Sequence, residues 1–386
     1  MISGSVKKIV ILGSAHPLRG GLATYNERLA RAYMEQGCDV TIYNFKLQYP
    51  SFLFPGKSQY SDSPAPEKLT IKTVVNSINP FNWCKIGREL RKLNPDLIIV
   101  KYWLPFIGPC FGTILRKAKK NKHTKVISIL DNIIPHEKRF GDRMFTKYFI
   151  KPVDGFVAMS ESVIKDLDTF DTVKPRVFCP HPLYDNFGAV MPRNEALEKL
   201  KLDPAFRYLL FFGFIRDYKG LDILLKAFAD SSVEKLPLRL LVAGEFYSDP
   251  KPYHELIQTL HLKDRVDLFT DFIPDDQVPL FFSACDLVIQ PYKHATQSGV
   301  TQIAYHFGKP MVVTDVGGLA EIVPHGKAGY VVNPEPSAIA EAIVDFFANH
   351  KMEVLTAGVE EEKKKYAWEN MTAALNSVLS QVVAIN

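Results

Sequence analysis

The sequence has few cysteines and none of the spacings that a cysteine-based site needs. Its 386 residues contain five cysteines, an odd number, and no CxxC pair. Neither a disulfide framework nor a cysteine-based zinc site is therefore expected. This pattern favours a reducing compartment.

Long hydrophobic runs are also missing. The N-terminal apolar run, residues 9–12, is shorter than the core of a secretory signal. The nearest candidate for a membrane span is the stretch 102–115, which contains Pro105 and Pro109. It falls short of the roughly 20 residues that a spanning helix needs. These absences predict a cytoplasmic protein.

Fingerprints of two other functional classes are missing as well. No GxGxxG motif follows the first predicted strand, which disfavours an NAD-dependent enzyme. No helix-turn-helix, zinc-finger or RNA-recognition pattern is present, so nucleic acid is not an expected partner. The composition, with 47% hydrophobic and 23% charged residues, is that of an ordinary globular protein.

Charge is unevenly distributed along the chain. Residues 1–185 carry 28 Lys and Arg against 16 Asp and Glu, whereas residues 186–386 carry 19 against 26. Net charges of +12 and −7 indicate that the first half faces an anionic partner. The densest basic segment, 116–125, directly follows the apolar stretch 102–115. This order is typical of a helix lying on an anionic membrane surface, and also of a solvated helix end rich in lysine.

Length and hydrophobic periodicity predict two α/β domains joined near residues 180–197. Domains usually have about 100–200 residues, so 386 residues suit two of them. Alternating strands and helices imply parallel sheets, and hence two Rossmann-like lobes with a cleft between them. The predicted strands are 8–12, 40–45, 97–101, 126–130, 155–159, 208–214, 238–244, 266–269, 286–291, 311–315 and 329–332. The predicted helices include 22–36, 221–229, 253–260, 300–307, 336–350 and 368–383.

Two glycines precede the first predicted helix. Gly20 and Gly21 stand directly before residues 22–36. Glycines let a backbone approach a ligand closely, and the free N–H groups of a helix start attract an anion. Phosphate contact and a plain tight turn both fit these residues.

Two cations follow the first strand of the second half. Arg216 and Lys219 lie between the strand 208–214 and the helix 221–229. Open α/β sheets bind ligands at the carboxyl ends of their strands. Arginine as a planar fork and lysine as a point charge suit a diphosphate. The alternative is a pair of solvent-facing cations in a surface loop.

Further candidates follow in the second half. Ser298 and Gly299 open the helix 300–307, whose first amides form a second anion site. Glu321 lies one turn beyond the strand end at 311–315 and its two glycines. A favourable charge near a helix N-terminus explains Glu321 equally well.

Several segments resemble the family-4 retaining glycosyltransferases, which have the GT-B architecture. The segments 211–228, 286–291, 298–308 and 314–332 are similar to the donor half of that family. The N-terminal segment 19–43 resembles it too. The segment 366–371, YAWENM, resembles the place where the family's chain crosses back to its first lobe. The similarity covers nearly the whole chain, and its motifs are more specific in the second half.

The resemblance implies the domain roles and the activity. Residues 1–185 would form an acceptor lobe completed by a helix at 368–386, and residues 190–366 a nucleotide-sugar donor lobe. A hexose would pass from a nucleotide-diphosphate sugar to an acceptor hydroxyl with retention of configuration, in surface polysaccharide or glycolipid synthesis. No cofactor and no metal are expected. The implied partners are the donor, a sugar or lipid-linked acceptor and, at the inner membrane face, an anionic membrane in peripheral contact.

The resemblance also assigns site residues. Asp131 would lie beside the transferred sugar, with His136 and Glu137 as weaker candidates nearby. Arg216 and Lys219 would hold the diphosphate and assist catalysis. The implied donor-binding residues are Gly20, Gly21, Gly213, Glu245, Phe272, Ile273, Ser298, Gly299, Val300, Gln302 and Glu321.

One departure from the family pattern bears on the activity. The family usually carries two glutamates eight residues apart, and the matching positions here are Ala295 and Ile303, or His294 and Gln302 after a shift of one residue. Gln302 and Glu321 replace these carboxylates, or the chain is a divergent branch, or its activity is altered. A non-catalytic nucleotide-sugar binding protein and a nucleotide-sugar epimerase therefore stay open as alternatives.

Overall fold

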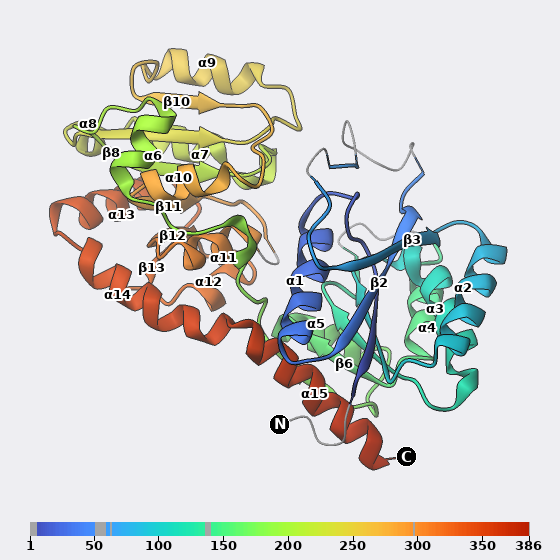
Figure 1. Ribbon diagram of the computed structural model, residues 1–386. Coiled ribbons are helices and arrows are strands. Elements are labelled where there is room, and N and C mark those ends of the chain that lie inside the picture. The colour runs from blue at the N-terminus through green and yellow to red at the C-terminus, as the bar shows by residue number, and fades with distance from the viewer. Residues whose placement is uncertain (1–5, 51–58, 62–63, 136–139, 296–297, 386) are drawn as a thin grey trace. The chain divides into compact units, whose positions relative to one another are not determined.

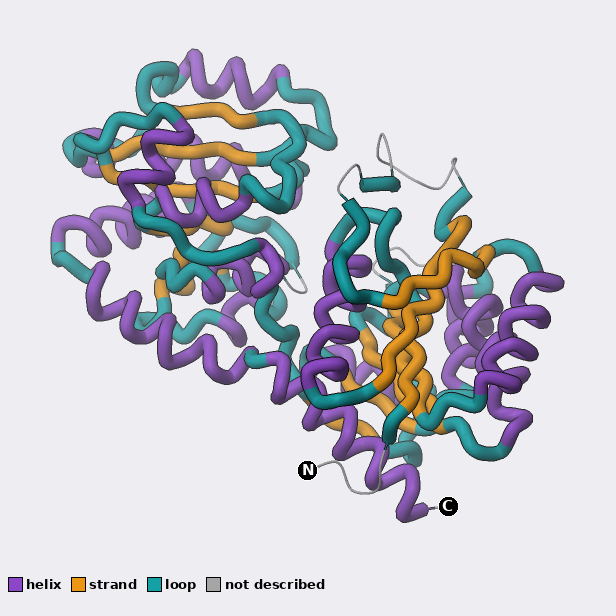
Figure 2. The backbone as a smooth tube through the Cα atoms, viewed as in Figure 1, coloured by secondary structure: helices purple, strands orange, loops and turns teal. Residues whose placement is uncertain are grey.

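The computed structural model describes residues 6–50, 59–61, 64–135, 140–295 and 298–385. The chain divides into two compact units. The first unit combines Met1–Pro182 with Ala367–Asn386, and the second is Leu183–Tyr366. The limits predicted from the sequence, 1–185 and 190–366, differ from these by a few residues. Each unit is a parallel sheet between helices, as Figure 2 shows with orange strands flanked by purple helices.

The first unit contains a sheet of seven described strands, all parallel. Their bounds are β1 Lys8–Leu12, β2 Asp39–Leu47, β3 Thr70–Asn76, β4 Leu97–Tyr102, β5 Lys125–Leu130, β6 Gly155–Ala158 and β7 Arg176–Phe178. Their spatial order is β3-β2-β1-β4-β5-β6-β7. The order reverses between β1 and β4, as in a doubly wound sheet. Every residue of β4 is buried, because a central parallel strand is covered on both faces.

Helices cover both faces of this sheet (Figure 1). One face packs against the first and last long helices of the chain, and the other against four helices between them. The first face carries α1 Gly21–Glu35 and α15 Trp368–Ile385. The second carries α2 Pro80–Leu93, α3 Gly108–Ala118, α4 Asp142–Ile150 and α5 Glu161–Asp168. The final helix therefore completes the core of the first unit.

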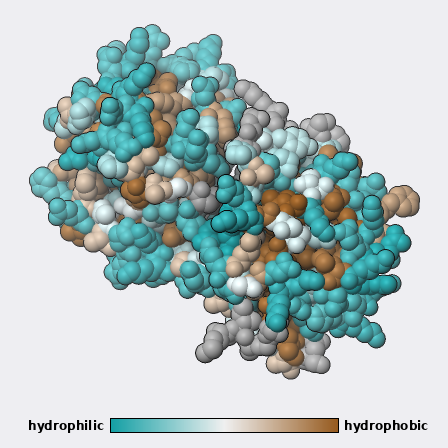
Figure 3. All heavy atoms as spheres, in the orientation of Figure 1, coloured by the Kyte–Doolittle hydropathy of each residue, from teal (hydrophilic) through white to brown (hydrophobic). Residues whose placement is uncertain are grey.

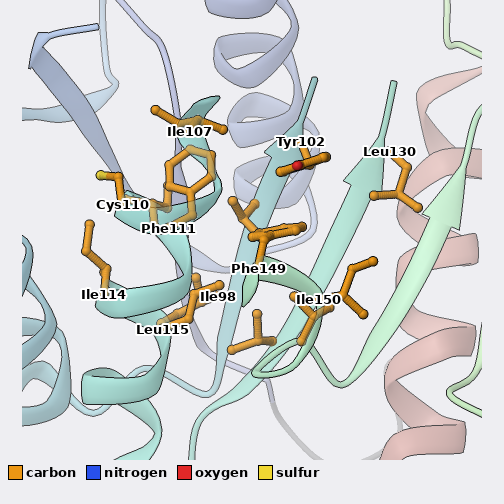
Figure 4. Packing of buried hydrophobic residues seen from close by; sticks show 14 of the residues in the cluster. Ile98, Tyr102, Ile107, Cys110, Phe111, Ile114, Leu115, Leu130, Phe149 and Ile150 are labelled. Atoms are coloured by element: carbon orange, nitrogen blue, oxygen red, sulfur yellow. The ribbon is translucent and has the colours of Figure 1, made fainter. Parts of the chain in front are cut away.

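The apolar stretch 102–115 is a core segment of the first unit. It comprises the end of β4 and most of α3, which lies between α2 and α4. Figure 4 shows Phe111, Ile114 and Leu115 among the other buried side chains of this cluster. Of the two alternatives left open for this stretch, a helix lying on a membrane through its apolar face does not fit, because most of the apolar side chains pack on the sheet, whereas Trp103, Leu104 and Phe106 are half-buried.

The edge strand β3 is covered only in part. Its Ile71 and Val74 are half-buried, and hydrophobic side chains gather around β2 and β3 on the face seen in Figure 3. The exposed Lys72 forms an ion pair with Glu89 of α2, with 3.6 Å between nitrogen and oxygen. A charged side chain on an edge strand discourages pairing with another chain.

The second unit repeats the architecture with six described parallel strands. Their bounds are β8 Arg207–Phe212, β9 Leu238–Ala243, β10 Val266–Phe269, β11 Leu287–Gln290, β12 Met311–Thr314 and β13 Gly329–Val332. Their spatial order is β10-β9-β8-β11-β12-β13. The helices are α6 Arg193–Leu200, α7 Leu221–Phe228, α8 Ser231–Glu234, α9 Lys251–Thr259, α10 Val278–Ala284, α11 Gly299–His306, α12 Leu319–Ile322, α13 Pro336–Ala348 and α14 Met352–Glu362.

Candidate functional site

The carboxyl ends of β8 and β11 form the switch point of the second sheet. These two strands are neighbours, and the strand order runs away from them in both directions. The helix that follows β8, α7, packs on one face of the sheet, whereas α11, which follows β11, packs on the other. Such a point leaves an opening at the strand ends, where open α/β sheets bind ligands.

The loop after β8 is shaped by two glycines with positive φ angles. Gly213 has φ 96°, and a Cβ atom there would lie 2.9 Å from the Lys219 ammonium. Gly220 has φ 70°, and a Cβ atom there would overlap the carbonyl oxygen of Pro291. Both conformations suit glycine, which has no Cβ. The loop therefore packs tightly against the segment that follows β11, with Lys219 between them.

Lys219 is a buried cation at the end of this loop. No carboxylate lies within ion-pair distance of its ammonium in the described part of the chain. The ring of Tyr292 lies 5.6 Å from this nitrogen. Burial lowers the pKa of Lys219; Tyr218 opposes this and the charge of Arg216 adds to it. A bound anion would offset this cost, because a buried charge is stable when it is paired.

Arg216 adds a second positive charge to the same loop. Its guanidinium lies 5.0 Å from the ring of Tyr247, and among the described residues it forms no ion pair. The backbone of Glu245, just after β9, anchors this loop, because its carbonyl accepts a 2.8 Å hydrogen bond from the Ile215 amide. The two cations and Glu245 therefore share the carboxyl edge of the sheet.

The start of α11 is held by a buried hydrogen-bond network from β11. The side-chain oxygen of Gln290, Oε1, accepts hydrogen bonds from the hydroxyl of Ser298 at 2.7 Å and from that of Thr301 at 3.0 Å. The hydroxyl of Tyr292 lies 3.2 Å from that of Ser298. Since these side chains fix the helix start, its first amides, which have no intrahelical partner, are held at the strand ends.

The helix start and the β8 loop lie side by side. A Cβ atom on Gly213 would lie 3.6 Å from a methyl carbon of Val300. A Cβ atom on Gly299 would lie 3.0 Å from the Tyr184 ring, so this position also suits a small residue. The structure thus brings two cations and a helix N-terminus to one edge, which is an arrangement for binding a diphosphate.

Gln302 is buried in α11 with an unsatisfied amide. Its side-chain oxygen and nitrogen are both buried, and neither forms a hydrogen bond to a residue that the structure describes. Buried polar groups are nearly always hydrogen-bonded, so this amide has both a donor and an acceptor with which to bind a polar group of a ligand. Of the two placements that the resemblance implies for the family's carboxylates, one falls on the half-buried Ala295 and the buried Ile303, and the other on the exposed His294 and the buried Gln302.

Three predicted donor residues lie farther from this group in the sheet. Phe272 and Ile273 follow β10, two strands from β8; Phe272 is exposed and Ile273 packs against the core. Glu321 is exposed in α12. The sequence did not identify Gln290 and Tyr292, although a glutamine that ends an apolar strand is a visible signal.

In the first unit, Gly20 and Gly21 start α1. Gly20 has φ 103° and accepts hydrogen bonds from the amides of Ala23 and Thr24 at 2.9 and 3.2 Å. No side chain caps this helix start. The preceding loop is fixed by Asn44, whose side-chain oxygen accepts a 2.9 Å hydrogen bond from the Ala15 amide. The glycines are thus held at the carboxyl end of β1.

Asp131 follows β5, and it is paired with a lysine that the sequence did not single out. The ammonium of Lys101, in β4, lies 3.0 Å from a carboxylate oxygen of Asp131. A lysine inside the apolar strand LIIVKY was the available signal. His136 and Glu137 lie outside the described residues.

No cluster of three His, Cys, Asp or Glu side chains that could hold a metal ion occurs in the described residues. Among the described helices, none has both the length and the apolar character to cross a membrane.

Both units of the chain match models of known glycosyltransferase families. Residues 19–180 match the family described as Glycosyltransferase Family 4, and residues 206–349 match Glycosyl transferases group 1. The chain belongs to glycosyltransferase family 4. The two matches cover most of the chain, one in each unit.

Individual relatives agree with this family. An uncharacterized glycosyltransferase of Methanocaldococcus jannaschii is 22% identical over 385 residues, 98% of this chain and 99% of that protein. The D-rhamnosyltransferase WbpZ of Pseudomonas aeruginosa is 26% identical over 267 residues, 67% of this chain and 66% of WbpZ. A D-inositol 3-phosphate glycosyltransferase of Corynebacterium urealyticum is 24% identical, and the match spans only 59% of its length.

Solved structures show the same fold. Anabaena HepE in complex with UDP has a TM-score of 0.72 and 17% identity, with 97% of this chain and 100% of that chain covered. A glycosyltransferase from Rickettsia africae has a TM-score of 0.73 and 16% identity, with 98% and 99% covered. The two Rossmann-like units of family 4 thus form the GT-B architecture expected from the sequence.

Proposed function

We propose that this glycosyltransferase moves a hexose from a nucleotide-diphosphate sugar to an acceptor hydroxyl, with retention of configuration, in surface polysaccharide or glycolipid synthesis. The observation that carries the proposal is Lys219, a buried ammonium without a carboxylate partner among the described residues. It lies with Arg216 and the start of α11 at the switch point of the second sheet. Further support comes from the titles of similar proteins: HepE binds UDP, and WbpZ is a D-rhamnosyltransferase.

The chemistry of the leaving group explains why these residues are needed. When the bond between the sugar and the diphosphate breaks, negative charge collects on the departing phosphate. Fixed cations and helix amides at that position stabilise the charge without having to reorganise. Lys219 and Arg216 therefore act on the β-phosphate, and the amides of Ser298, Gly299 and Val300 bind the same diphosphate.

The other assigned residues have binding roles in this proposal. Asp131 accepts a hydrogen bond from the transferred sugar, and Gly20 and Gly21 offer backbone amides to the donor. Gln302 binds a donor hydroxyl in place of a carboxylate, since an amide can both donate and accept a hydrogen bond. Glu245, Phe272, Ile273 and Glu321 surround the nucleotide and the sugar, and Gly213 admits the diphosphate to the loop.

The test begins with a panel of UDP, GDP, ADP and their sugars. A ligand at about 100 times its dissociation constant stabilises the folded protein by ~2.7 kcal/mol, which a thermal shift detects. With the donor so found, Lys219→Ala and Arg216→Ala are each expected to lower kcat by ~10²-fold or more. Lys226→Ala removes an exposed lysine from α7 and serves as the matched control. Near-normal turnover in the folded double variant would reject the diphosphate role.

Product analysis separates the alternatives. A new glycosidic product with the donor's anomeric configuration supports retaining transfer. An epimerised nucleotide-sugar identifies the epimerase. Tight binding with neither transfer nor slow donor hydrolysis identifies a binding protein instead.

We also propose that the protein works in the cytoplasm in peripheral contact with an anionic inner membrane face. Support comes from α4 and not from the buried stretch 102–115. The outward residues of α4 include Arg143, Met144, Lys147 and Tyr148, all of them exposed. Their spacing puts cations and apolar groups on one stripe, a combination that suits a lipid–water interface.

A further inference from the structure

Lys101 lies in a place where a lysine is costly. It belongs to the central strand β4, its side chain is 4% exposed, and its ammonium is 3.0 Å from Asp131. Asp131 directly follows β5, where its amide donates a 2.9 Å hydrogen bond to the carbonyl of Tyr102. The face of the Tyr25 ring, from α1, lies 3.4 Å from the ammonium. The lysine is thus enclosed at the switch point between β1 and β4.

Of the charged groups near Asp131 that the structure describes, Lys101 is the one that affects the pKa of this carboxylate. His181, after β7, packs edge-on against the Tyr25 ring, and burial together with Lys101 lowers the pKa of His181 to about 3. Its Nδ1 lies 2.7 Å from the carbonyl oxygen of Pro182, so the neutral ring donates there and brings no charge. Arg28 of α1 lies instead over the Trp368 ring. Among the described residues, no other charged group contributes to the pKa of Asp131.

The second oxygen of Asp131 is available. The side chain is 20% exposed, and the described residues form no hydrogen bond to its Oδ2. An ionised carboxylate is an acceptor only, whereas a protonated one also donates. The charge state of Asp131 therefore decides which hydrogen bond it offers.

We propose that Lys101 is a positioning residue that keeps the Asp131 carboxylate ionised and fixed through one oxygen, so that the other oxygen accepts a hydrogen bond from a sugar hydroxyl. This inference rests on the proposed function in assigning the hydroxyl to the transferred sugar. Lys101 itself does not touch the substrate.

The sign of the effect follows from the two opposing influences on Asp131. Burial raises the pKa of this carboxyl above its usual value, and the charge of Lys101 opposes that rise without cancelling it. Burial also lowers the pKa of Lys101, and the charge of Asp131 opposes that change. Removal of the ammonium leaves burial unopposed, so the pKa of Asp131 rises further. The fraction of active, ionised enzyme then falls at a given pH and recovers as the pH is raised.

The first experiment compares pH profiles of kcat/KM for the wild type, Lys101→Met and Lys101→Arg. Lys101→Met is expected to raise the apparent pKa of the acidic limb by at least one pH unit. At pH values below this apparent pKa, kcat/KM should then be about tenfold lower than in the wild type. Lys101→Arg restores the limb toward its wild-type position, because the positive charge returns. Lys125→Met, at the opposite end of β5, is the matched control. If Lys101→Met lowers the melting temperature but leaves the acidic limb of the kcat/KM profile where it is in the wild type, Lys101 has only a packing role and the proposal is overturned.

A second readout does not depend on transfer. The ¹³C resonance of the Asp131 carboxyl, assigned by its loss in Asp131→Asn, is titrated in the wild type and in Lys101→Met. A higher pKa in Lys101→Met supports the proposal even if no donor is turned over, in which case the proposed function fails alone. If transfer is observed while neither the limb nor the resonance moves, the Lys101 proposal fails and the proposed function stands.

Discussion

At the scale of single residues, two buried glutamines in the second unit differ in how their amides are satisfied. The side-chain oxygen of Gln290 accepts hydrogen bonds from Ser298 and Thr301, and its side-chain nitrogen contacts the Met311 sulfur. Gln302, one turn into α11, forms no side-chain hydrogen bond within the described part of the chain. The first glutamine has a structural role, and the second has the property expected of a ligand-binding group. Their substitution should therefore have opposite effects on stability.

We expect Gln302→Leu to leave the free energy of unfolding of the ligand-free protein unchanged or up to ~2 kcal/mol higher, because two unpaired buried atoms are removed. Gln290→Leu should lower it by about 1–3 kcal/mol, because the hydroxyls of Ser298 and Thr301 lose their acceptor. Donor affinity should fall about tenfold in Gln302→Leu, the equivalent of one hydrogen bond. Urea unfolding and calorimetric titration measure the two quantities.

One result of these measurements would contradict a donor-binding role for Gln302. If Gln302→Leu destabilises the ligand-free protein as much as Gln290→Leu does while donor affinity is unchanged, Gln302 is a packing residue. The proposed contact with a donor hydroxyl would then be abandoned.

Sequence reasoning found the loops of the site better than the partners of their side chains. Arg216, Lys219 and Ser298 were identified because strand ends and helix starts are visible in the hydrophobic pattern. Lys101 was not identified, because its pairing with Asp131 depends on the register of β4 against β5. Register in a parallel sheet joins segments that are distant in sequence, and one sequence does not reveal it.

At the scale of elements, α4 presents a basic and partly apolar face to solvent. Arg143 and Lys147 are one turn apart, as are Met144 and Tyr148. Arg116 of α3 holds Tyr148 in place. Its guanidinium lies 3.7 Å from the Tyr148 ring and donates a 2.6 Å hydrogen bond to the backbone carbonyl oxygen of Tyr148. The face is therefore built on the core helix α3.

Neutralising this face should weaken binding to anionic vesicles. Each lysine or arginine near such a surface contributes about 1 kcal/mol, so Arg143→Gln with Lys147→Gln should lower the partition coefficient roughly 30-fold. Sedimentation with phosphatidylglycerol-containing vesicles at low and high salt measures it. Arg91→Gln with Lys92→Gln removes the same charge from the exposed end of α2 and is the matched control.

Two results of the vesicle experiment would contradict a specific role of α4. Equal losses in the two double variants would mean that net charge alone drives binding. Absence of binding in the wild type at low salt would reject membrane contact through α4.

The elements that sequence patterns missed share a physical cause. Strand β1 was predicted with its observed bounds, because its apolar run marks a buried parallel strand. The edge strands β10 and β13 were also predicted with their observed bounds, from short and largely apolar segments. The edge strands β3 and β7 and the helices α2, α4, α5 and α6 were not predicted, and α6 begins inside the segment 180–197 that was predicted as the linker between the domains. They are half-exposed, so polar residues interrupt their apolar periodicity, and α2 buries few residues along its length.

At the scale of the whole molecule, the first unit is discontinuous in sequence. The core between its sheet and α1 includes Trp368, Leu375 and Val378 of α15, which follow the entire second unit along the chain. Helix α15 packs against β5, β6 and β7, as Figure 1 shows for the red helix beside the first unit. Mutations near the C-terminus should therefore destabilise the N-terminal sheet.

We expect Leu375→Ala to lower the free energy of unfolding of the first unit by about 2–5 kcal/mol, as for other buried leucines. Hydrogen exchange should accelerate in β5, β6 and α1 and stay unchanged in the second unit. Ile343→Ala, a buried aliphatic residue of α13, is the matched control and should accelerate exchange only in the second unit. Protection lost from β8 to β13 in Leu375→Ala would contradict this division.

The late position of α15 has a consequence for biosynthesis. A ribosome that has made residues 1–182 has supplied all the strands of the first sheet but not the helix that covers one side of it. That nascent sheet exposes apolar side chains until the final helix has left the exit tunnel, by which time residues 183–366 have already been synthesised. The domain translated first is thus the last to be completed, and chaperones would find their longest-lived binding site on it.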